Sequence, residues 1–541
     1  MDRCERRCYA RYRILVASVL VLVGCTTFDH ELTKPPECIT NAECTAKLST
    51  GGTVTPAVCV QEPAGHCVQL MSEDCTVVTG DYTDDHAVLI ASLLQTTGIA
   101  SATNIPRQQT AIMAVEQINS ITSGGILQSA TPGDTRKMVM VSCDVAANLP
   151  RVATHLITEL QVPAIVGPNL SQDTLDLTLG NDAIGLPSSA RAGTALFTPA
   201  GVASAIATVP DNGLTYMMTP SDIQRTPLMK QQINALEDQL KTERSKSSIK
   251  LGIYYRSDAV GTGTRDGLTT LMINDAPLAT AISLGKARQD TYDLLSTDEH
   301  VLVAAYAAFQ PDIIVVVGGA EAIKYFVQPL EAAWPAGVPR PYYVGIDATK
   351  VPDLLTAAAS SNDLRLRFRG TGIASPAESV QVFSAFQLAY GQRWKDTDGN
   401  PQPANASGMG SVYDAVYTIA LALVGKQDIH GASMVTGLAN LANNTAACAY
   451  DALGVLPPCF SLTDHSRTLF ANMGALLDHT PVTEIGTFGR LEWDTEGAKA
   501  SGLIEMWCIN GTGPKPIFSS SGLTYDIKTQ TSAGTYVQCG P

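Results

Sequence analysis

The sequence predicts an α/β protein with two lobes, each a doubly wound parallel sheet covered by helices, preceded by a Cys-rich tether. Three observations support this prediction. The chain has 541 residues, which is more than one hydrophobic core accommodates. Short apolar runs typical of buried strands alternate with segments of helical spacing, and the alternation occurs in two series that divide near Asp222. Such alternation indicates parallel strands joined by crossover helices.

The first residues have the pattern of a secretory signal. Five arginines precede the apolar run 14–23, which is too short to span a membrane as a stable helix. The segment "LVGC" (22–25) resembles the lipobox of bacterial lipoproteins, in which the signal is cleaved before the cysteine and the cysteine is acylated. We therefore expect a signal peptide at 1–24 and lipidation of Cys25. An ordinary signal peptide with an incidental cysteine is the alternative.

The remaining cysteines indicate disulfide bonds in an oxidising compartment. Of thirteen cysteines, Cys4 and Cys8 leave with the signal and Cys25 takes the lipid. An even number remains, which suits five disulfides of unspecified connectivity: Cys38, Cys44, Cys59, Cys67, Cys75, Cys143, Cys448, Cys459, Cys508 and Cys539. The pairs Cys448–Cys459 and Cys508–Cys539, which close short loops, are expected first. A zinc site is the alternative, but the chain has no CxxC pair and its histidines are scattered, so we expect no metal.

Residues 25–74 differ in composition from the rest of the chain. They are rich in Cys, Thr, Gly and Pro and have little apolar periodicity. This segment is too short to build a core of its own, so we expect a tether that contains a small disulfide-stapled knot.

The first series of strands and helices follows the tether. Within 107–120, the residues Ile112, Val115 and Ile118 fall at helical spacing. We expect strands at 87–94, 137–144, 164–167 and 194–201, and helices at 107–120, 149–160 and from about Ser171.

The second series follows Asp222. We expect helices at 227–240 and 411–423, and strands at 249–256, 312–319 and 341–347. Ligands of doubly wound sheets bind at the carboxyl ends of the strands, so we expect a site between the two lobes.

Charge and motifs exclude several functions. Lys and Arg number 36 against 51 Asp and Glu, an acidic balance that disfavours nucleic acid as a partner. The segment "GTGTRDG" (261–267) lacks the glycine spacing of a dinucleotide loop and the lysine of a P-loop, and a turn before a helix explains it. The segment "DTDGN" (396–400) lacks the later ligands of a calcium loop. No hydrolase or zinc-protease motif is present, so we expect no enzyme and no cofactor, although catalytic triads assemble in space and leave no fixed motif.

Seven segments, in order, resemble the type 1 periplasmic-binding fold, in the branch of branched-chain amino-acid (Leu/Ile/Val) receptors of ABC importers. No single segment is diagnostic, and together they extend over about 76–541. They are "AVEQINSITSGGI" (114–126), "AIVGPNLSQDT" (164–174), "LFTPAG" (196–201), "MTPSDIQRTPLM" (218–229), "YYRSDAVGTGTRDGL" (254–268), "YDAVYTIALAL" (413–423) and "GTFGRLEWDTEG" (486–497).

The resemblance implies two lobes joined by three crossovers that close on a ligand like a hinged trap. It places lobe 1 at 75–218 and about 346–480, and lobe 2 at 219–345 and about 481–541. The positions that match the family's ligand contacts are Asn169, Ser171, Ala200, Gly201, Asp222 and Asp347.

The resemblance also implies roles for these residues. In the family, a hydroxyl and backbone N–H groups at a helix start hold the ligand carboxylate, which is the role implied for Ser171, Ala200 and Gly201. Asp347 would receive a ligand ammonium. Ser171 and Asp222 would equally suit helix N-caps, and this alternative stays open.

Three positions depart from the family pattern. Val202 replaces a threonine, while Val260 and Ala320 replace aromatic residues. These departures imply a roomier and less polar pocket and weaken the expectation of an amino acid as the ligand.

The resemblance implies a lipid-anchored, extracytoplasmic protein that captures a small polar solute, amino-acid-like or a related carboxylate, and presents it to an ABC permease. The expected location is the periplasmic face of the cell envelope, on the outer or inner membrane. The alternative is a ligand sensor or envelope scaffold protein that uses the same fold without transport.

We predict that Cys25→Ala abolishes acylation of the protein, because the acyl groups are attached at that cysteine. Metabolic labelling with a fatty-acid analogue measures this directly. Labelling that survives the substitution would rule out lipidation at Cys25.

Overall fold

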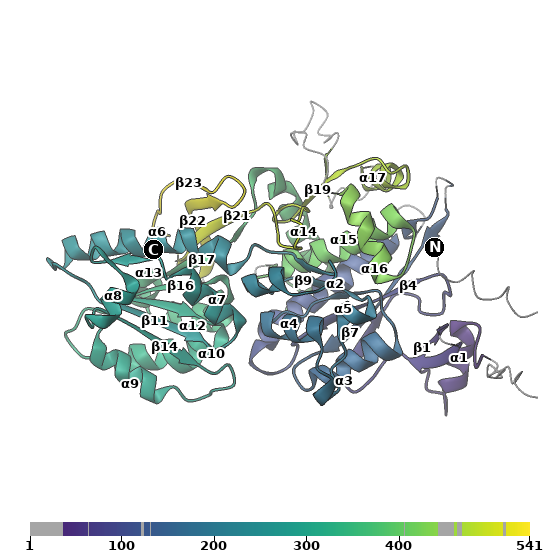
Figure 1. The fold of residues 1–541 in the computed structure, drawn as a ribbon, viewed down its shortest axis with the longest axis horizontal. Helices are drawn as coiled ribbons and strands as arrows, with labels where there is room; N and C mark the ends of the chain where they lie inside the picture. The colour runs from purple at the N-terminus through teal and green to yellow at the C-terminus, as the bar shows by residue number, and fades with distance from the viewer. Residues whose placement is uncertain are drawn as a thin grey trace, which may run out of the picture.

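Two α/β lobes lie side by side in the computed structural model, with a small Cys-rich module at the far end of the first lobe (Figure 1). The structure describes residues 36–62, 64–120, 124–129, 131, 133–404, 406–441, 459–461, 468–511 and 516–540. The α/β class with two lobes is therefore confirmed. Within these ranges, no helix has both the length and the apolar character needed to cross a bilayer.

Lobe 1 is built on a six-stranded sheet whose central strands are almost entirely buried, as their mainly apolar sequences require. Neighbouring strands are parallel except β3, which runs antiparallel to β7. In spatial order the strands are β10 (Thr215–Met217), β9 (Ala195–Thr198), β8 (Ala164–Val166), β4 (Val88–Leu94), β7 (Met138–Asp144) and β3 (Cys75–Thr79).

Helices cover both faces of this sheet. The helices from the first half of the chain are α2 (Ser101–Ser120), α3 (Leu149–Ala153), its π-helical continuation η2 (Thr154–Glu159), α4 (Ser171–Leu179) and α5 (Ser189–Ala192). Short 3-10 turns and a two-stranded ribbon complete this part: η1 (Gly98–Ala100), η3 (Asp182–Ile184), η4 (Ser204–Thr208), β5 (Ile126–Leu127) and β6 (Thr135–Arg136).

A helix from the second half of the chain forms the centre of the lobe 1 core. Helix α15 (Met409–Lys426) is buried from Met409 to Gly425 and packs against α2, because nearly all its residues are apolar or small. Around it lie α14 (Val380–Arg393), α16 (Gly431–Met434), α17 (Thr468–Leu477), η7 (Ala377–Ser379), η8 (Val435–Asn440), β18 (Cys459–Ser461), β19 (Thr483–Gly486) and β20 (Gly489–Arg490).

Lobe 2 is built on an eight-stranded mixed sheet, and not on a purely parallel one. The strands from β14 to β17 are parallel, while β21 runs antiparallel to β17 and is extended by β22 and β23. The connections from β21 to β22 and from β22 to β23 are short, and such connections join only antiparallel neighbours. In spatial order they are β14 (Ala287–Tyr292), β11 (Leu251–Arg256), β15 (Ile313–Val317), β16 (Tyr342–Gly345), β17 (Phe368–Ala374), β21 (Leu503–Asn510), β22 (Ile517–Asp526) and β23 (Thr531–Ala533).

The helices of lobe 2 follow the βα alternation predicted from the second series. They are α6 (Asp222–Glu243), α7 (Ala259–Gly267), α8 (Leu278–Ser283), α9 (His300–Phe309), α10 (Ala320–Ala322), its π-helical continuation η5 (Ile323–Val327), α11 (Gln328–Ala333), η6 (Asp347–Thr349), α12 (Pro352–Ser360) and α13 (Asn362–Arg367). A small ribbon joins β12 (Met272–Ile273) to β13 (Ala276–Pro277).

The lobe boundaries differ from those predicted. Residues 346–374 belong to lobe 2 and not to lobe 1, because β17 pairs with β16 on one side and β21 on the other. Residues 483–490 stay with lobe 1, since β19 packs against α14 and α15. The chain therefore crosses between the lobes three times, between β10 and α6, between β17 and α14, and between β20 and β21.

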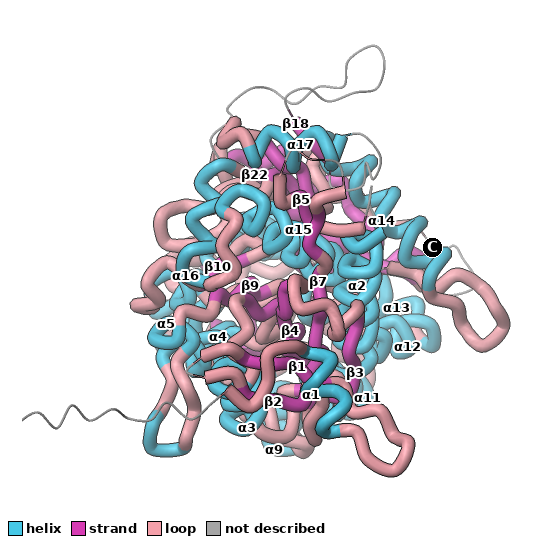
Figure 2. The backbone as a smooth tube through the Cα atoms, turned by 90° about the vertical axis from the view of Figure 1, so that its right-hand side faces the viewer, coloured by secondary structure: helices cyan, strands magenta, loops and turns pink. Residues whose placement is uncertain are grey.

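The N-terminal module docks on lobe 1 and is more than a tether. It consists of α1 (Asn41–Leu48), β1 (Ala57–Val60) and β2 (His66–Gln69), which lie beside the lobe 1 strands in Figure 2. The backbone N–H of Asn41 donates to Asp85 Oδ1 at 2.6 Å, and Val58 and Val60 join an apolar cluster of the lobe. Arg151 ion-pairs with Asp74 at 2.7 Å.

Disulfides hold the module and both lobes. The structure joins Cys38 to Cys59, Cys44 to Cys67, Cys75 to Cys143, and Cys508 to Cys539, the last being a pair expected from the sequence. The expected pair Cys448–Cys459 lies outside the description, because Cys448 and the side chain of Cys459 are not among the described parts of the chain. Residues 1–24 and Cys25 lie outside it as well.

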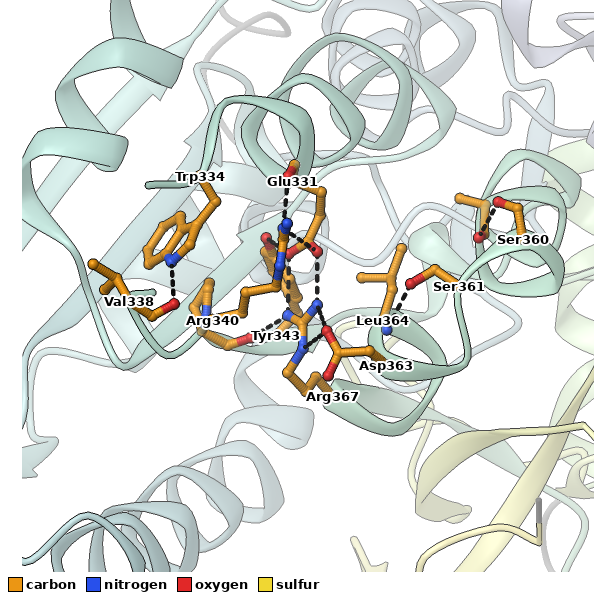
Figure 3. Close-up of polar contacts among 12 residues, drawn as sticks. Glu331, Trp334, Val338, Arg340, Tyr343, Ser360, Ser361, Asp363, Leu364 and Arg367 are labelled. Carbon is orange, nitrogen blue, oxygen red and sulfur yellow. Dashed lines mark hydrogen bonds and ion pairs between the residues drawn. The ribbon is translucent and has the colours of Figure 1, made fainter. Parts of the chain in front are cut away.

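A buried ion-pair network connects three elements of lobe 2 (Figure 3). Glu331 of α11 accepts from Arg367 of α13 at 2.6 Å and from Arg340 at 2.9 Å, and the hydroxyl of Tyr343 in β16 donates to it at 2.7 Å. Burial raises the pKa of Tyr343 well above its usual value, so the phenol stays protonated and donates. Glu331 thus fixes two helices on the sheet.

We predict that Glu331→Gln lowers the free energy of unfolding by about 3 kcal/mol, because it leaves the buried Arg367 with only the exposed carboxylate of Asp363 as a charge partner. Urea denaturation measures this loss. Asp363→Asn is the matched control: Asp363 also pairs with Arg367, but its side chain is 65% exposed, so the expected loss is below about 1 kcal/mol. Equal losses in the two variants would contradict the role given to Glu331.

Candidate functional site

A cleft opens where the carboxyl ends of the two sheets face each other, as expected for doubly wound sheets. Its cavity volume is about 160 Å³, which corresponds to roughly a dozen water positions and so to a small solute. Lobe 1 contributes Asn104, Arg107, Asn169, Ser171, Ala200, Val202 and Ser407, among others. Lobe 2 contributes Arg256, Val260, Leu295, Ala320, Glu321, Ile346, Asp347 and Lys350, among others.

Ser171 lies in the cleft wall, but its hydroxyl oxygen already has two partners. It accepts from the backbone N–H groups of Val202 at 2.9 Å and Ala203 at 3.1 Å. Ser171 is the first residue of α4 and not its N-cap, because the cap position is Leu170. The hydroxyl therefore joins the start of α4 to the loop after β9, and Ser171 itself has no exposed surface in this structure.

The loop after β9 is held from within the protein. The N–H of Gly201 donates to Thr198 Oγ1 at 2.9 Å, so this backbone donor, expected to hold a carboxylate, is used inside the loop. Ala200 lines the cleft, while Gly201 lies behind it, where a Cβ would stand 2.4 Å from Thr198 Oγ1. Gly201 is therefore required for packing.

Asn169 lines the cleft and supports its neighbouring strand. Its Oδ1 accepts from the N–H of Gln95, at the end of β4, at 2.8 Å. The side chain is 95% buried, and its NH₂ group has no hydrogen-bond partner among the described residues. This amide can donate to a ligand.

Asp222 does not line the cleft. It lies behind Val202 and Val260 in a separate cavity of about 10 Å³, large enough for about one water. Asp222 Oδ1 accepts from Ser204 at 3.0 Å and Ile223 at 2.6 Å, whereas Oδ2 is buried without a hydrogen bond in the described structure. Burial raises the pKa of Asp222 to about 6. The N-cap of α6 is Ser221, so the capping alternative for Asp222 is also wrong.

Asp347 reaches the cleft from the 3-10 turn after β16. Its Oδ1 ion-pairs with Arg225 of α6, and its Oδ2 accepts from Ser407 of lobe 1 at 3.4 Å. The carboxylate implied as an ammonium acceptor is therefore already neutralised by an arginine. Its contact with Ser407 joins the two lobes across the cleft.

Sequence reasoning missed four charged residues of the cleft, because nothing in their local sequence distinguishes them. Arg107 is the first residue of a predicted helix and lies within the longer α2, and Arg256 ends a predicted strand. Glu321 and Lys350 follow the ends of β15 and β16. Their proximity arises from the meeting of strand ends that are far apart in the chain.

Three of these residues form ion pairs within lobe 2. Arg256 contacts Asp258 at 2.7 Å and Glu321 at 3.4 Å. Glu321 Oε1 also accepts from the hydroxyl of Tyr292 and the N–H of Gly319, both at 2.8 Å. In addition, Lys350 contacts Glu505 at 3.1 Å.

Arg107 is the lobe 1 cation of the cleft. Its Nε donates to the carbonyl of Ser407 at 2.7 Å and its Nη1 to Asn104 Oδ1 at 2.8 Å. Burial lowers the pKa of Arg107 to about 10, opposed by the charge of Asp347, so the guanidinium remains charged at neutral pH.

The three departures from the family pattern all lie at the cleft. Val202, Val260 and Ala320 present apolar surface to it, together with Ile346. Val202, Val260 and Ile346 also line the small cavity around Asp222, so they form the partition between the two spaces. The cleft thus combines this apolar surface with polar and charged lining residues.

One cluster of possible metal ligands lies in the N-terminal module. In the described part of the chain, the cluster of metal-ligand atoms that stands out is Cys38, Cys44 and Cys67. All three sulfur atoms are engaged in disulfides, and a cysteine binds a metal as a thiolate.

No sequence-family model matches this chain, and no curated protein sequence matches it. Solved structures do. The branched-chain amino acid transporter substrate binding protein LivJ from Streptococcus pneumoniae, in complex with isoleucine, matches with a TM-score of 0.54 at 17% identity, over 80% of this chain and 99% of that one.

Two further structures are similar. A leucine binding protein, LivK, from Thermotoga maritima matches with a TM-score of 0.53 at 13% identity, over 80% of this chain and 98% of that one. A solute binding protein of an ABC transporter from Rhodopseudomonas palustris, in complex with 3,4-dihydroxybenzoic acid, matches with a TM-score of 0.54 at 13% identity, over 82% of this chain and 98% of that one. At these identities the likeness shows the fold, which is that of type 1 periplasmic binding proteins.

We predict that Asp222→Asn stabilises the protein at pH 8 by up to about 3 kcal/mol and leaves its stability at pH 4 nearly unchanged. The pKa of Asp222 is raised to about 6, whereas an unfolded aspartate titrates near 3.9. The stabilisation from the bound proton is therefore complete below about pH 4 and lost as the pH rises through about 6. Asparagine keeps the Oδ1 acceptor and removes the charge.

Urea unfolding at the two pH values measures this effect. Asp238→Asn, on the exposed face of the same helix, controls for the loss of one negative charge. A variant less stable than the wild type at pH 8 would mean that the ionised carboxylate is favourably paired in the folded protein.

Proposed function

We propose that this protein is an extracytoplasmic solute-binding protein that captures a small polar solute between its lobes and delivers it to an ABC importer. The observation that carries the proposal is the cleft itself, whose walls come from the strand ends of both sheets. A solute in this position contacts both lobes only when they are closed, so its binding free energy favours the closed form.

The solutes of similar proteins support a carboxylate ligand. Structures with this fold are described in complex with isoleucine, leucine, 3,4-dihydroxybenzoic acid, benzoate and 4-hydroxybenzoate. All of these carry a carboxylate and a mainly apolar body. The cleft of this chain offers the corresponding chemistry, with an apolar wall and buried donors.

The site residues suggested by the sequence take different roles in this proposal. Asn169 donates to the solute from lobe 1, Ala200 lies against it, and Ser171 shapes the cleft wall by holding the loop after β9. Gly201 and Asp222 do not contact the solute and instead form hydrogen bonds that fix the loop after β9. Asp347 acts by positioning Arg225 and by meeting Ser407 from the other lobe when the cleft closes.

The proposed location is the periplasmic face of the cell envelope, with an acyl anchor at Cys25. The described disulfides support an oxidising compartment, since such bonds persist outside the cytosol. The docked Cys-rich module then lies between the anchor and lobe 1.

We predict that amino acids or small carboxylates raise the free energy of unfolding of the wild type by about 2.7 kcal/mol at 100 times their Kd. Ala320→Trp should abolish this gain, because an indole at the start of α10 fills the cleft. Ligand-dependent thermal melting measures both.

The matched control is Ala359→Trp, at an exposed position of α12 in the same lobe, which should keep the full gain. A wild type that no solute stabilises would refute solute capture. A full gain in Ala320→Trp would place the ligand outside the cleft.

A further inference from the structure

We infer that the ligand of the cleft is a carboxylate that carries no ammonium group, with an apolar body, and that Arg107 is the residue that binds its carboxylate. This inference rests on the proposed function and defines the class of solute. It follows from which charges in the cleft already have partners and which do not.

Arg107 is a buried cation without an ion pair. Its side chain lines the cleft and the residue is only 7% exposed. Two of its nitrogens donate to neutral oxygens of Ser407 and Asn104, and no carboxylate of the described residues forms an ion pair with it. Nη2 has no hydrogen-bond partner within the same part of the chain. A guanidinium edge of this kind suits a carboxylate, which it binds through two parallel hydrogen bonds.

The guanidinium is held in place from one side. Gly408 has a φ of +79°, and a Cβ there would stand 2.9 Å from Arg107 Nε and 3.0 Å from Nη2. The backbone at Gly408 therefore lies directly against the arginine, and the Ser407 carbonyl beside it receives the Nε proton. Arg107 is consequently positioned before any ligand arrives.

The acidic groups of the cleft, in contrast, already have cations. Asp347 is paired with Arg225, and Glu321 is paired with Arg256 and also accepts two hydrogen bonds. A ligand ammonium would have to replace one of these arginines or remain buried without a partner. Burying a charge without a partner is costly, so the cleft disfavours an ammonium.

The remaining surface suits an apolar body. Val202, Val260, Ala320 and Ile346 form one wall of the cleft, and each is 9% exposed or less. A solute with its carboxylate at Arg107 would place its apolar part against this wall. The volume, roughly a dozen water positions, accommodates an aromatic or branched aliphatic acid.

Ligand pairs that differ only in the amino group test the inference. Isothermal titration compares 4-methylpentanoate with leucine and 3-phenylpropanoate with phenylalanine, and 3-methylbutylamine provides the ammonium without the carboxylate. We expect each acid to bind at least tenfold more tightly than its amino acid, and the amine not to bind.

Variants of Arg107 test the residue. Arg107→Gln should weaken binding of the acids at least tenfold, and Arg107→Lys should restore part of the affinity. Arg369→Gln is the matched control: Arg369 is a buried arginine of lobe 2 that does not line the cleft, so its loss should leave the Kd unchanged whatever it does to stability. Thermal melting of each variant separates lost folding from lost binding.

The outcomes distinguish the inference from the function it rests on. Amino acids that bind as tightly as their deaminated counterparts, or an unchanged Kd in Arg107→Gln, would overturn the inference and leave solute capture intact. Failure of every acid and amino acid to bind the wild type would overturn both. If Arg107→Gln does not fold, the affinities of the wild type for the ligand pairs and the affinity of Arg107→Lys for the acids still test the inference.

Discussion

The arrangement of the cleft depends on one constraint: polar groups buried at the ends of parallel strands must find partners inside the protein. Ser171 satisfies two backbone N–H groups of the next loop, and Asn169 satisfies the end of β4. Asp347 and Glu321 are satisfied by arginines in lobe 2. Once these pairings are made, few strong donors remain that face the cavity, and they decide what the cavity can bind.

The parts of the fold that could be predicted are those in which the residues of a strand by themselves indicate that the strand is buried. Strands β8 and β15 are continuous apolar runs and β4 and β7 are mainly apolar, and their buried positions follow directly. Strand β17 was missed because two glycines and an arginine interrupt it. The glycines leave room for the side chain of Trp507, which is distant in the sequence: a Cβ at Gly370 would stand 2.5 Å from its ring. Such a requirement cannot be read from the strand alone, and the misplaced lobe boundary followed from it.

In the candidate site, too, only the features that depend on local sequence could be predicted. The sequence located the wall around Ser171, because a strand end followed by a helix start is a local pattern. It could not show that Asp347 is paired with Arg225 or that Asp222 lies behind a partition, since both depend on segments brought together by the lobe crossings. Arg107 escaped notice for the same reason: its partners, Ser407 and Gly408, are about 300 residues away in the chain.

The docking of the Cys-rich module gives the two lobes unequal mechanical roles. The contacts described for the module all lie on lobe 1, and the disulfide between Cys75 and Cys143 fastens the start of that lobe to its own sheet. Under the proposed acylation of Cys25, lobe 1 would be the half held at the membrane and lobe 2 the half that moves on closing. Lobe 1 would then set the orientation of a bound solute relative to the membrane, and lobe 2 would present the face that changes most.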